Sequence, residues 1–131
     1  MAKNFDRAAF QIGEPAQIDK VTISSAATDT GNTGTTHILR AGLVLGKITT
    51  GGEYSEYKST NSDGTQLVAN CLVLLEDVDL KNGDLTATSV DRIGRVAIIA
   101  RVKESGLIGL DAAAKAALIP GGAATAQYTF E

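Results

Sequence analysis

The chain has 131 residues, of which 44% are hydrophobic and 21% charged, and its formal net charge is −3. This length suits a single domain that buries a hydrophobic core without help from disulfides or metals. The 12 lysines and arginines are scattered singly and form no basic stripe, so direct binding to nucleic acid is not predicted. Apolar runs reach only about five residues, far short of a membrane span, so no membrane partner is predicted.

The composition favours a β-rich fold. Aromatic residues make up 5% of the chain, tryptophan is absent and there are 14 glycines. This profile is typical of short strands joined by tight turns. The residues after the first methionine include no apolar run typical of a signal peptide, so we expect synthesis in the cytoplasm.

The N-terminal segment, residues 1–36, is typical of an extended arm. Its large apolar residues are sparse, and residues 24–36 are all small or polar. Such a segment buries too little apolar area to offset the entropy lost on ordering, which favours a disordered tail in the free protein. Residues 21–24, however, alternate and are β-branched, which favours a strand. The alternative is therefore an arm that is loose alone and becomes a strand on a partner.

From residue 37 to residue 131 the pattern is that of a folded domain. Apolar and β-branched runs separated by glycine, asparagine and aspartate predict strands. These runs cover residues 43–49, 53–58, 72–78, 85–90, 95–102 and 127–130. Asn82-Gly83 predicts a type I′ hairpin turn, because both central positions of that turn need a positive φ.

One helix is predicted near the C-terminus. Asp111 is suited to cap residues 112–118, which are good helix formers, and Pro120 ends the helix. We therefore expect a mainly β fold with one short helix (α+β). Its body, residues 37–131, would be a compact barrel-like or sandwich-like domain, and residues 1–36 would form a flexible N-terminal arm.

Groups suited to catalysis are sparse, and we do not expect an enzyme. The single histidine, His37, lies in a polar stretch where we expect it to be flexible. The single cysteine, Cys71, lies in an apolar run where we expect it to be buried. The sequence has no phosphate-binding glycine motif and no zinc motif, so no cofactor is predicted.

A group of acidic residues is the one candidate for a metal site in the sequence: Glu76, Asp77, Asp79 and Asp84. Hard cations need several oxygens that converge on one point. Strand alternation places Asp77 and Asp79 on one face and Glu76 on the other. A solvated strand end beside a turn is therefore favoured over a metal site.

Several short motifs follow one another in a recognisable order. They are Arg40-Ala41-Gly42-Leu43-Val44-Leu45-Gly46-Lys47, a short strand with Tyr54 and Tyr57, Ser62-Asp63-Gly64-Thr65, the run 74–79, a turn with Gly83-Asp84, and the Ala-rich helix. In this order and spacing, residues 39–118 resemble the lambda-type bacteriophage head decoration proteins. Each motif is short, so the resemblance rests on their order. The long arm and the tail after Pro120 depart from the pattern.

The resemblance implies a β-rich fold that assembles as a homotrimer. Such trimers sit as knobs on the outer surface of the expanded capsid in the virion, at three-fold and quasi-three-fold positions. The resemblance also implies that the N-terminal arm becomes ordered on the major capsid protein of the phage. The motif residues to which it assigns a structural part are Arg40, Ala41, Gly42, Gly46, Asp63 and Gly64.

We expect the arm to bind by adding a strand to an exposed strand edge of the capsid protein. By bridging neighbouring capsomers, the bound protein would stabilise the head against internal DNA pressure. The arm residues expected to bind are Phe10, Ile12, Ile18, Val21, Thr22, Ile23 and Ser24.

Two other classes of protein stay open. A phage tail or neck accessory structural protein would also combine an arm with a β domain. A biotinyl-like or lipoyl-like carrier module would display a lysine at a hairpin tip, for which Lys81 beside Asn82-Gly83 is the nearest equivalent.

Overall fold

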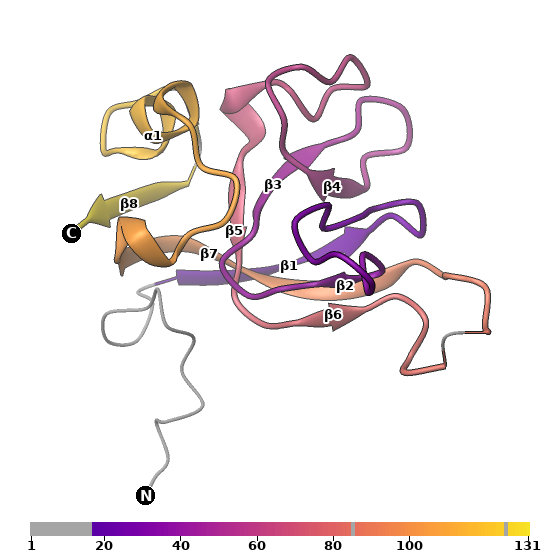
Figure 1. The fold of residues 1–131 in the computed structure, drawn as a ribbon. Coiled ribbons are helices and arrows are strands. Elements are labelled where there is room, and N and C mark those ends of the chain that lie inside the picture. Colours follow the sequence, from indigo (N-terminus) through magenta and orange to yellow (C-terminus); the bar gives the residue numbers. More distant parts are fainter. Residues whose placement is uncertain (1–16, 85, 125) are drawn as a thin grey trace, which may run out of the picture.

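Five strands close into a barrel, and further strands lie beside it (Figure 1). The computed structural model describes residues 17–84, 86–124 and 126–131. Its strands are β1 (Gln17–Ile23), β2 (Ile38–Leu39), β3 (Val44–Lys47), β4 (Tyr54–Glu56), β5 (Leu72–Leu74), β6 (Val78–Asp79), β7 (Arg92–Val102) and β8 (Gln127–Phe130). Its helical elements are the 3₁₀ turns η2 (Val68–Asn70) and η3 (Glu104–Gly106) and the helix α1 (Ala112–Leu118).

The barrel follows the order β1-β4-β3-β5-β7 and closes because β7 also pairs with β1. Within the barrel only β1–β4 is parallel. β8 adds to the sheet in parallel with the last part of β7, and β2 and β6 form a separate antiparallel pair. The prediction of a mainly β, barrel-like fold with one short helix is confirmed.

The longest strand, β7, is the one with which most of the sheet is paired. It has 11 residues and pairs with β1, β5 and β8. In Figure 1, β1 and β7 run side by side across the molecule, with α1 and β8 near one end of the pair and β2 and β6 toward the other. None of the described helices has the length and apolar character needed to cross a membrane.

The core fills the barrel and the space between the barrel and α1. Its largest fully buried side chains are Tyr57, Tyr128, Ile23, Leu39, Leu43, Leu45, Leu74, Leu80, Leu118, Val44 and Val73. Ile23 comes from β1, so the strand within the predicted arm contributes to the same core as the body.

Residues 17–36 of the predicted arm are part of the described structure and contact the body. The strand expected around residues 21–24 is present as β1, which pairs with β7 along its whole length. The following polar stretch is attached to the body by hydrogen bonds that Asp29 accepts from Arg40 and that Thr30 donates to Glu56.

Two strand predictions in the middle of the chain need correction. The run 72–78 is divided into β5 and β6, and residues 86–90, expected to be a strand, form no strand. Asn82 and Gly83 do have positive φ values, 54° and 84°, as the turn prediction requires. After the turn, the Asp84 carboxylate accepts hydrogen bonds from both the backbone N–H and the hydroxyl of Thr86. Such local bonds compete with strand pairing.

The C-terminal predictions are confirmed. The Asp111 carboxylate accepts a hydrogen bond from the Ala114 N–H at 2.8 Å and caps α1. The last strand, β8, carries the buried Tyr128. The Tyr128 hydroxyl accepts from the Val73 N–H at 2.9 Å and donates to the Ala97 carbonyl, so it joins β5 to β7 inside the core.

Candidate functional site

The residues predicted to bind a partner through the arm lie mostly on β1. Of these, Ile18 is 43% exposed and Ile23 is fully buried. Thr22 is exposed and Val21 is half-buried against the core. The remaining predictions, Phe10 and Ile12, lie outside the described residues. Ser24 follows β1 and donates its N–H to the Tyr54 carbonyl at 2.9 Å.

The two edges of β1 differ. One edge pairs with β7 in antiparallel register from Gln17 to Ile23. On the other edge, only Ile23 pairs, with Tyr54 of β4. Within the described residues, the stretch 17–22 therefore has no second neighbouring strand. Backbone groups on alternate residues of a strand point to opposite edges, so this stretch offers donors and acceptors to another chain.

Arg40, a motif residue, holds the polar stretch before it. Its Nε and Nη2 donate to the two Asp29 oxygens at 2.8 and 3.1 Å, and its backbone N–H donates to the same carboxylate at 3.2 Å. The Asp29 side chain is fully buried. Burial raises the pKa of Asp29, but the hydrogen bonds and charge of Arg40 outweigh this, so the net pKa is lowered. The sequence prediction missed Asp29, whose only signal was an acidic residue within a polar stretch.

Ala41 and Gly42 attach the same segment to two other parts of the chain. The Ala41 N–H donates to the Asp77 carboxylate at 2.8 Å. The Gly42 N–H donates to the Leu74 carbonyl, and the Gly42 carbonyl accepts from the Ile108 N–H. Through its backbone, this part of the motif therefore connects the segment around residues 74–77 with the segment at Ile108.

The second group of motif residues joins a loop to β3. A Cβ atom at Gly46 would lie 2.2 Å from the Thr65 carbonyl oxygen, so only glycine lets the loop approach this strand. Gly64 has a φ of +110°, and a Cβ there would lie 2.3 Å from Thr49 Oγ1. The Asp63 carboxylate accepts hydrogen bonds from the Thr65 N–H and hydroxyl. The structure thus brings Gly46 and the 63–65 loop together.

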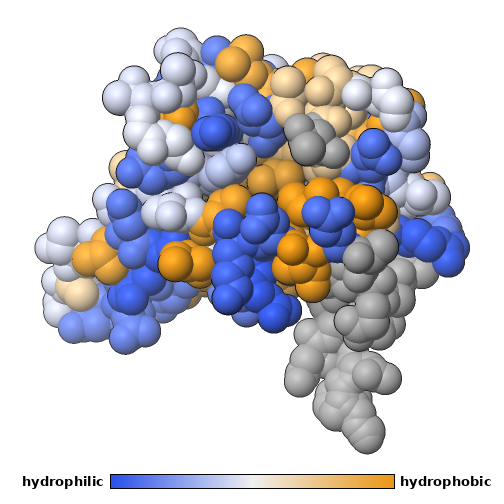
Figure 2. Space-filling model, turned by 180° about the vertical axis from the view of Figure 1, so that it is seen from behind, coloured by the Kyte–Doolittle hydropathy of each residue, from blue (hydrophilic) through white to orange (hydrophobic). Residues whose placement is uncertain are grey.

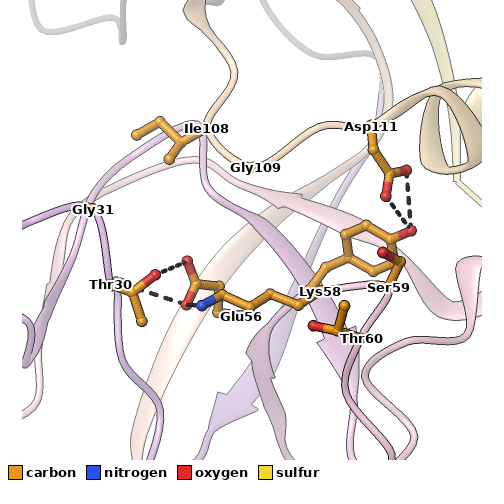
Figure 3. A pocket seen from close by; sticks show the side chains of 10 residues that line it. Thr30, Gly31, Glu56, Lys58, Ser59, Thr60, Ile108, Gly109 and Asp111 are labelled. Atoms are coloured by element: carbon orange, nitrogen blue, oxygen red, sulfur yellow. Dashed lines mark hydrogen bonds and ion pairs between the residues drawn. The ribbon is translucent and has the colours of Figure 1, made fainter.

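A pocket of about 420 Å³ lies between residues 30–31, 56–60 and 108–111 (Figure 3). Its two carboxylates have partners within the protein. Glu56 accepts from the Thr30 hydroxyl at 3.2 Å, and the Tyr57 hydroxyl lies 2.9 Å from Asp111 Oδ2. Burial, followed by this bond to Asp111, raises the pKa of Tyr57. These contacts join the polar stretch, β4 and the N-terminus of α1. The sequence prediction identified Asp111 as a cap but missed its second partner.

The single cysteine and the single histidine both have low solvent exposure in the structure. Cys71 is buried, as predicted, and burial followed by the nearby charge of Asp111 raises the pKa of its thiol to about 12. The thiol is therefore protonated at neutral pH, in which state it is a weak nucleophile. The side chain of His37, which we expected to be flexible, is 11% exposed in the structure, and its Nε2 lies 3.7 Å from Asp79 Oδ1.

The acidic residues considered as a metal site each have a separate partner. Asp77 accepts from Ala41, Asp79 accepts from the Lys81 N–H at 2.9 Å, and Glu76 lies 3.5 Å from Arg95. Among the described residues, no group of three or more His, Cys, Asp or Glu side chains is arranged to hold a metal ion. These hydrogen bonds and this ion pair are typical of surface carboxylates that stabilise the local fold.

Comparison with known proteins supports the order of motifs. Residues 7–126 match the sequence model of one family, described as bacteriophage lambda head decoration protein D. No curated protein matches the chain, and no solved structure does. The match spans all described strands except β8, and it includes both groups of motif residues that the fold brings together. The chain therefore belongs to the family of the bacteriophage lambda head decoration protein D.

Proposed function

We propose that this protein is a capsid decoration, or cement, protein that binds the outer surface of the expanded head of its phage as a homotrimer. The observation that carries the proposal is the family match over residues 7–126. It favours a role on the phage head over the tail accessory and carrier alternatives. The partner would be the major capsid protein, and the protein would act by binding, not by catalysis.

The edge of β1 supports binding by strand addition. Residues 17–22 pair with β7 on one side and leave their second edge without a neighbouring strand in the described structure. An exposed strand edge binds a second strand through backbone hydrogen bonds. We therefore propose that the capsid strand pairs with this open edge, while β1 stays in the barrel. Residues 1–16, which include Phe10 and Ile12, would extend the contact.

The energetics favour an oligomer. Ordering about ten arm residues costs on the order of 10–20 kcal/mol of backbone entropy. Burying about four large apolar side chains returns roughly 6–12 kcal/mol, and each added hydrogen bond contributes about 0.5–1.5 kcal/mol. One arm is therefore close to balanced and should bind weakly. Linking three arms in one trimer raises the avidity by roughly two to four orders of magnitude.

A bound trimer would contact more than one capsomer, which gives the protein its proposed mechanical role. DNA packed in the head pushes neighbouring capsomers apart. A subunit that bridges two of them must lose its own contacts before they separate. The free energy of binding would then add to the resistance of the shell.

The test is to mix the purified protein with emptied, expanded heads of its own phage and to image them by electron microscopy. We expect knobs at three-fold positions, a trimer mass in solution, and no binding to procapsids. Bare heads after saturating incubation would contradict the decoration function. Equal binding to procapsids and expanded heads would contradict the preference for the expanded state.

A deletion of residues 1–16 tests the arm. The deletion has to stop before Gln17, because Ile23 of β1 is part of the core and the loss of β1 would open the barrel. We expect the truncated protein to fold and to bind the heads at least about tenfold more weakly. Full-strength binding by the truncated protein would contradict a role for the arm.

A further inference from the structure

The outward face of the β1–β7 pair combines apolar and positively charged side chains. Its members, which we call the β1–β7 face, are Ile18 and Lys20 of β1 and Ile93, Arg95, Ile99 and Arg101 of β7. The register places Lys20 opposite Arg95 and Ile18 opposite Ala97, and the members are all exposed. In Figure 2, hydrophobic and hydrophilic residues alternate in a band across the middle of the molecule.

Exposed isoleucines are concentrated on this face. Single exposed apolar residues are common and need no explanation. Of the six large hydrophobic residues that are exposed in the described structure, three are Ile18, Ile93 and Ile99. Ile93 is the most exposed of the six, at 69%. None of the three is needed for the core, so the core does not account for isoleucine at these positions.

The charge of this face is opposite to that of the whole chain. The net charge of the protein is −3, whereas β7 contains three arginines and no acidic residue. Arg95 and Arg101 each have one acidic neighbour at the margin, Glu76 and Glu131. The Arg95–Glu76 pair is about half exposed on both sides, so an incoming carboxylate can replace Glu76 at little cost.

We infer that the β1–β7 face is a docking surface for an acidic protein surface on the phage shell. Arginine with apolar side chains is typical of the centre of a protein interface, and charge complementarity selects the acidic partner. The inference deepens the proposed function and rests on it. The face includes the first described strand of the chain, so it is continuous with the open β1 edge proposed for strand addition. Two copies of the face would repel each other if they met symmetrically.

Two pairs of matched variants test the inference in the full-length protein. The charge pair compares Lys20→Glu with Lys47→Glu, which makes the same charge change at an exposed lysine on β3 outside the face. The apolar pair compares Ile93→Thr with Leu67→Thr, which changes a 47% exposed leucine beside η2. Threonine keeps the β-branch at position 93, and circular dichroism and the thermal midpoint check that each variant is folded.

The measurement is the affinity for emptied, expanded heads at about 50 mM and about 500 mM NaCl. We expect the charge variant to bind at least about tenfold more weakly at low salt, with a smaller difference at high salt. Ile93→Thr should also weaken binding, by roughly tenfold, and the two control variants should bind like the wild type.

The outcomes separate the inference from the proposed function. Wild-type binding with unchanged binding by both face variants would overturn the inference and leave the decoration function standing. Loss of the trimer mass in the face variants would assign the face to contacts between subunits and would also overturn it. No binding by the wild-type protein would overturn both.

Discussion

The barrel and the polar stretch at residues 24–36 are held by different forces. Strands β3, β5 and β7 bury aliphatic side chains against one another, and Leu45, Val73 and Val96 are fully buried. The polar stretch has almost no large apolar side chain, and its centre is a carboxylate, Asp29, bound by Arg40. Thr30 attaches it to β4 through Glu56.

This difference shows how a segment with little hydrophobic content can be part of a folded domain. Apolar burial is non-directional and scales with area, whereas hydrogen bonds to a buried charge act between particular atoms. We therefore expect the polar stretch to depend on the protonation state of Asp29, whereas the aliphatic core of the barrel should not depend on it. The loss of unfolding free energy caused by substitutions should therefore differ between the two regions, both in size and in pH dependence.

The largest loss of stability is expected from a substitution in the barrel. Leu45→Ala removes a fully buried side chain from β3 and leaves a cavity between strands that are already paired. We expect the free energy of unfolding to fall by about 4 kcal/mol, by a similar amount at neutral and acidic pH. Urea denaturation measures this. A loss below about 1 kcal/mol would show that the core collapses around the site.

An intermediate loss of stability is expected from a substitution in the polar stretch. Asp29→Asn keeps the shape of the side chain and removes the charge that Arg40 binds, so the unfolding free energy at pH 7 should fall by about 2 kcal/mol. The pKa of Asp29 is lowered in the folded protein, below its ordinary value of 3.8. Its stabilising contribution is therefore full above about pH 3.8 and is lost as the pH falls through the folded value.

The pH dependence of stability therefore gives a second comparison of the wild type with Asp29→Asn. The difference in unfolding free energy between them should be constant from neutral pH down to about pH 3.8 and should shrink as the pH falls further. Arg40→Lys, which keeps the charge and loses the two-point contact, serves as the control for geometry. A difference that stays constant as the pH falls below about 3.8 would contradict the role given to the Asp29 charge.

The smallest loss of stability is expected where the N-terminus of α1 contacts the barrel through Tyr57. Asp111→Ala removes the helix cap and the acceptor of the Tyr57 hydroxyl, and should lower the unfolding free energy by about 1–2 kcal/mol. Asp111→Asn, which can still accept both hydrogen bonds, should recover most of the loss. Equal destabilisation by both changes would mean that the carboxylate acts through its charge.

Much of the fold could be read from local patterns. Periodicity indicated the strands around residues 43–49 and 95–102, and the Asp111 cap indicated α1. The paired positive φ values at Asn82-Gly83 follow from the residue types alone. The order of the motifs also led to the family that the comparison then showed. Apart from the order of the motifs, which extends over residues 39–118, each of these signals lies within a few residues along the chain.

The tertiary structure alone decided which distant residues meet. Arg40 binds Asp29 across 11 residues, and Tyr57 binds Asp111 across 54. The Tyr128 hydroxyl reaches Val73 across 55 residues to join β5 to β7. Composition predicted a loose segment before residue 37, because it measures apolar content and cannot reveal a buried ion pair whose partner is supplied by the fold. The sequence by itself determined most of the elements and the family, because both depend on local residue patterns and their order. The tertiary structure decided which polar groups are buried together, because their partners lie far apart along the chain.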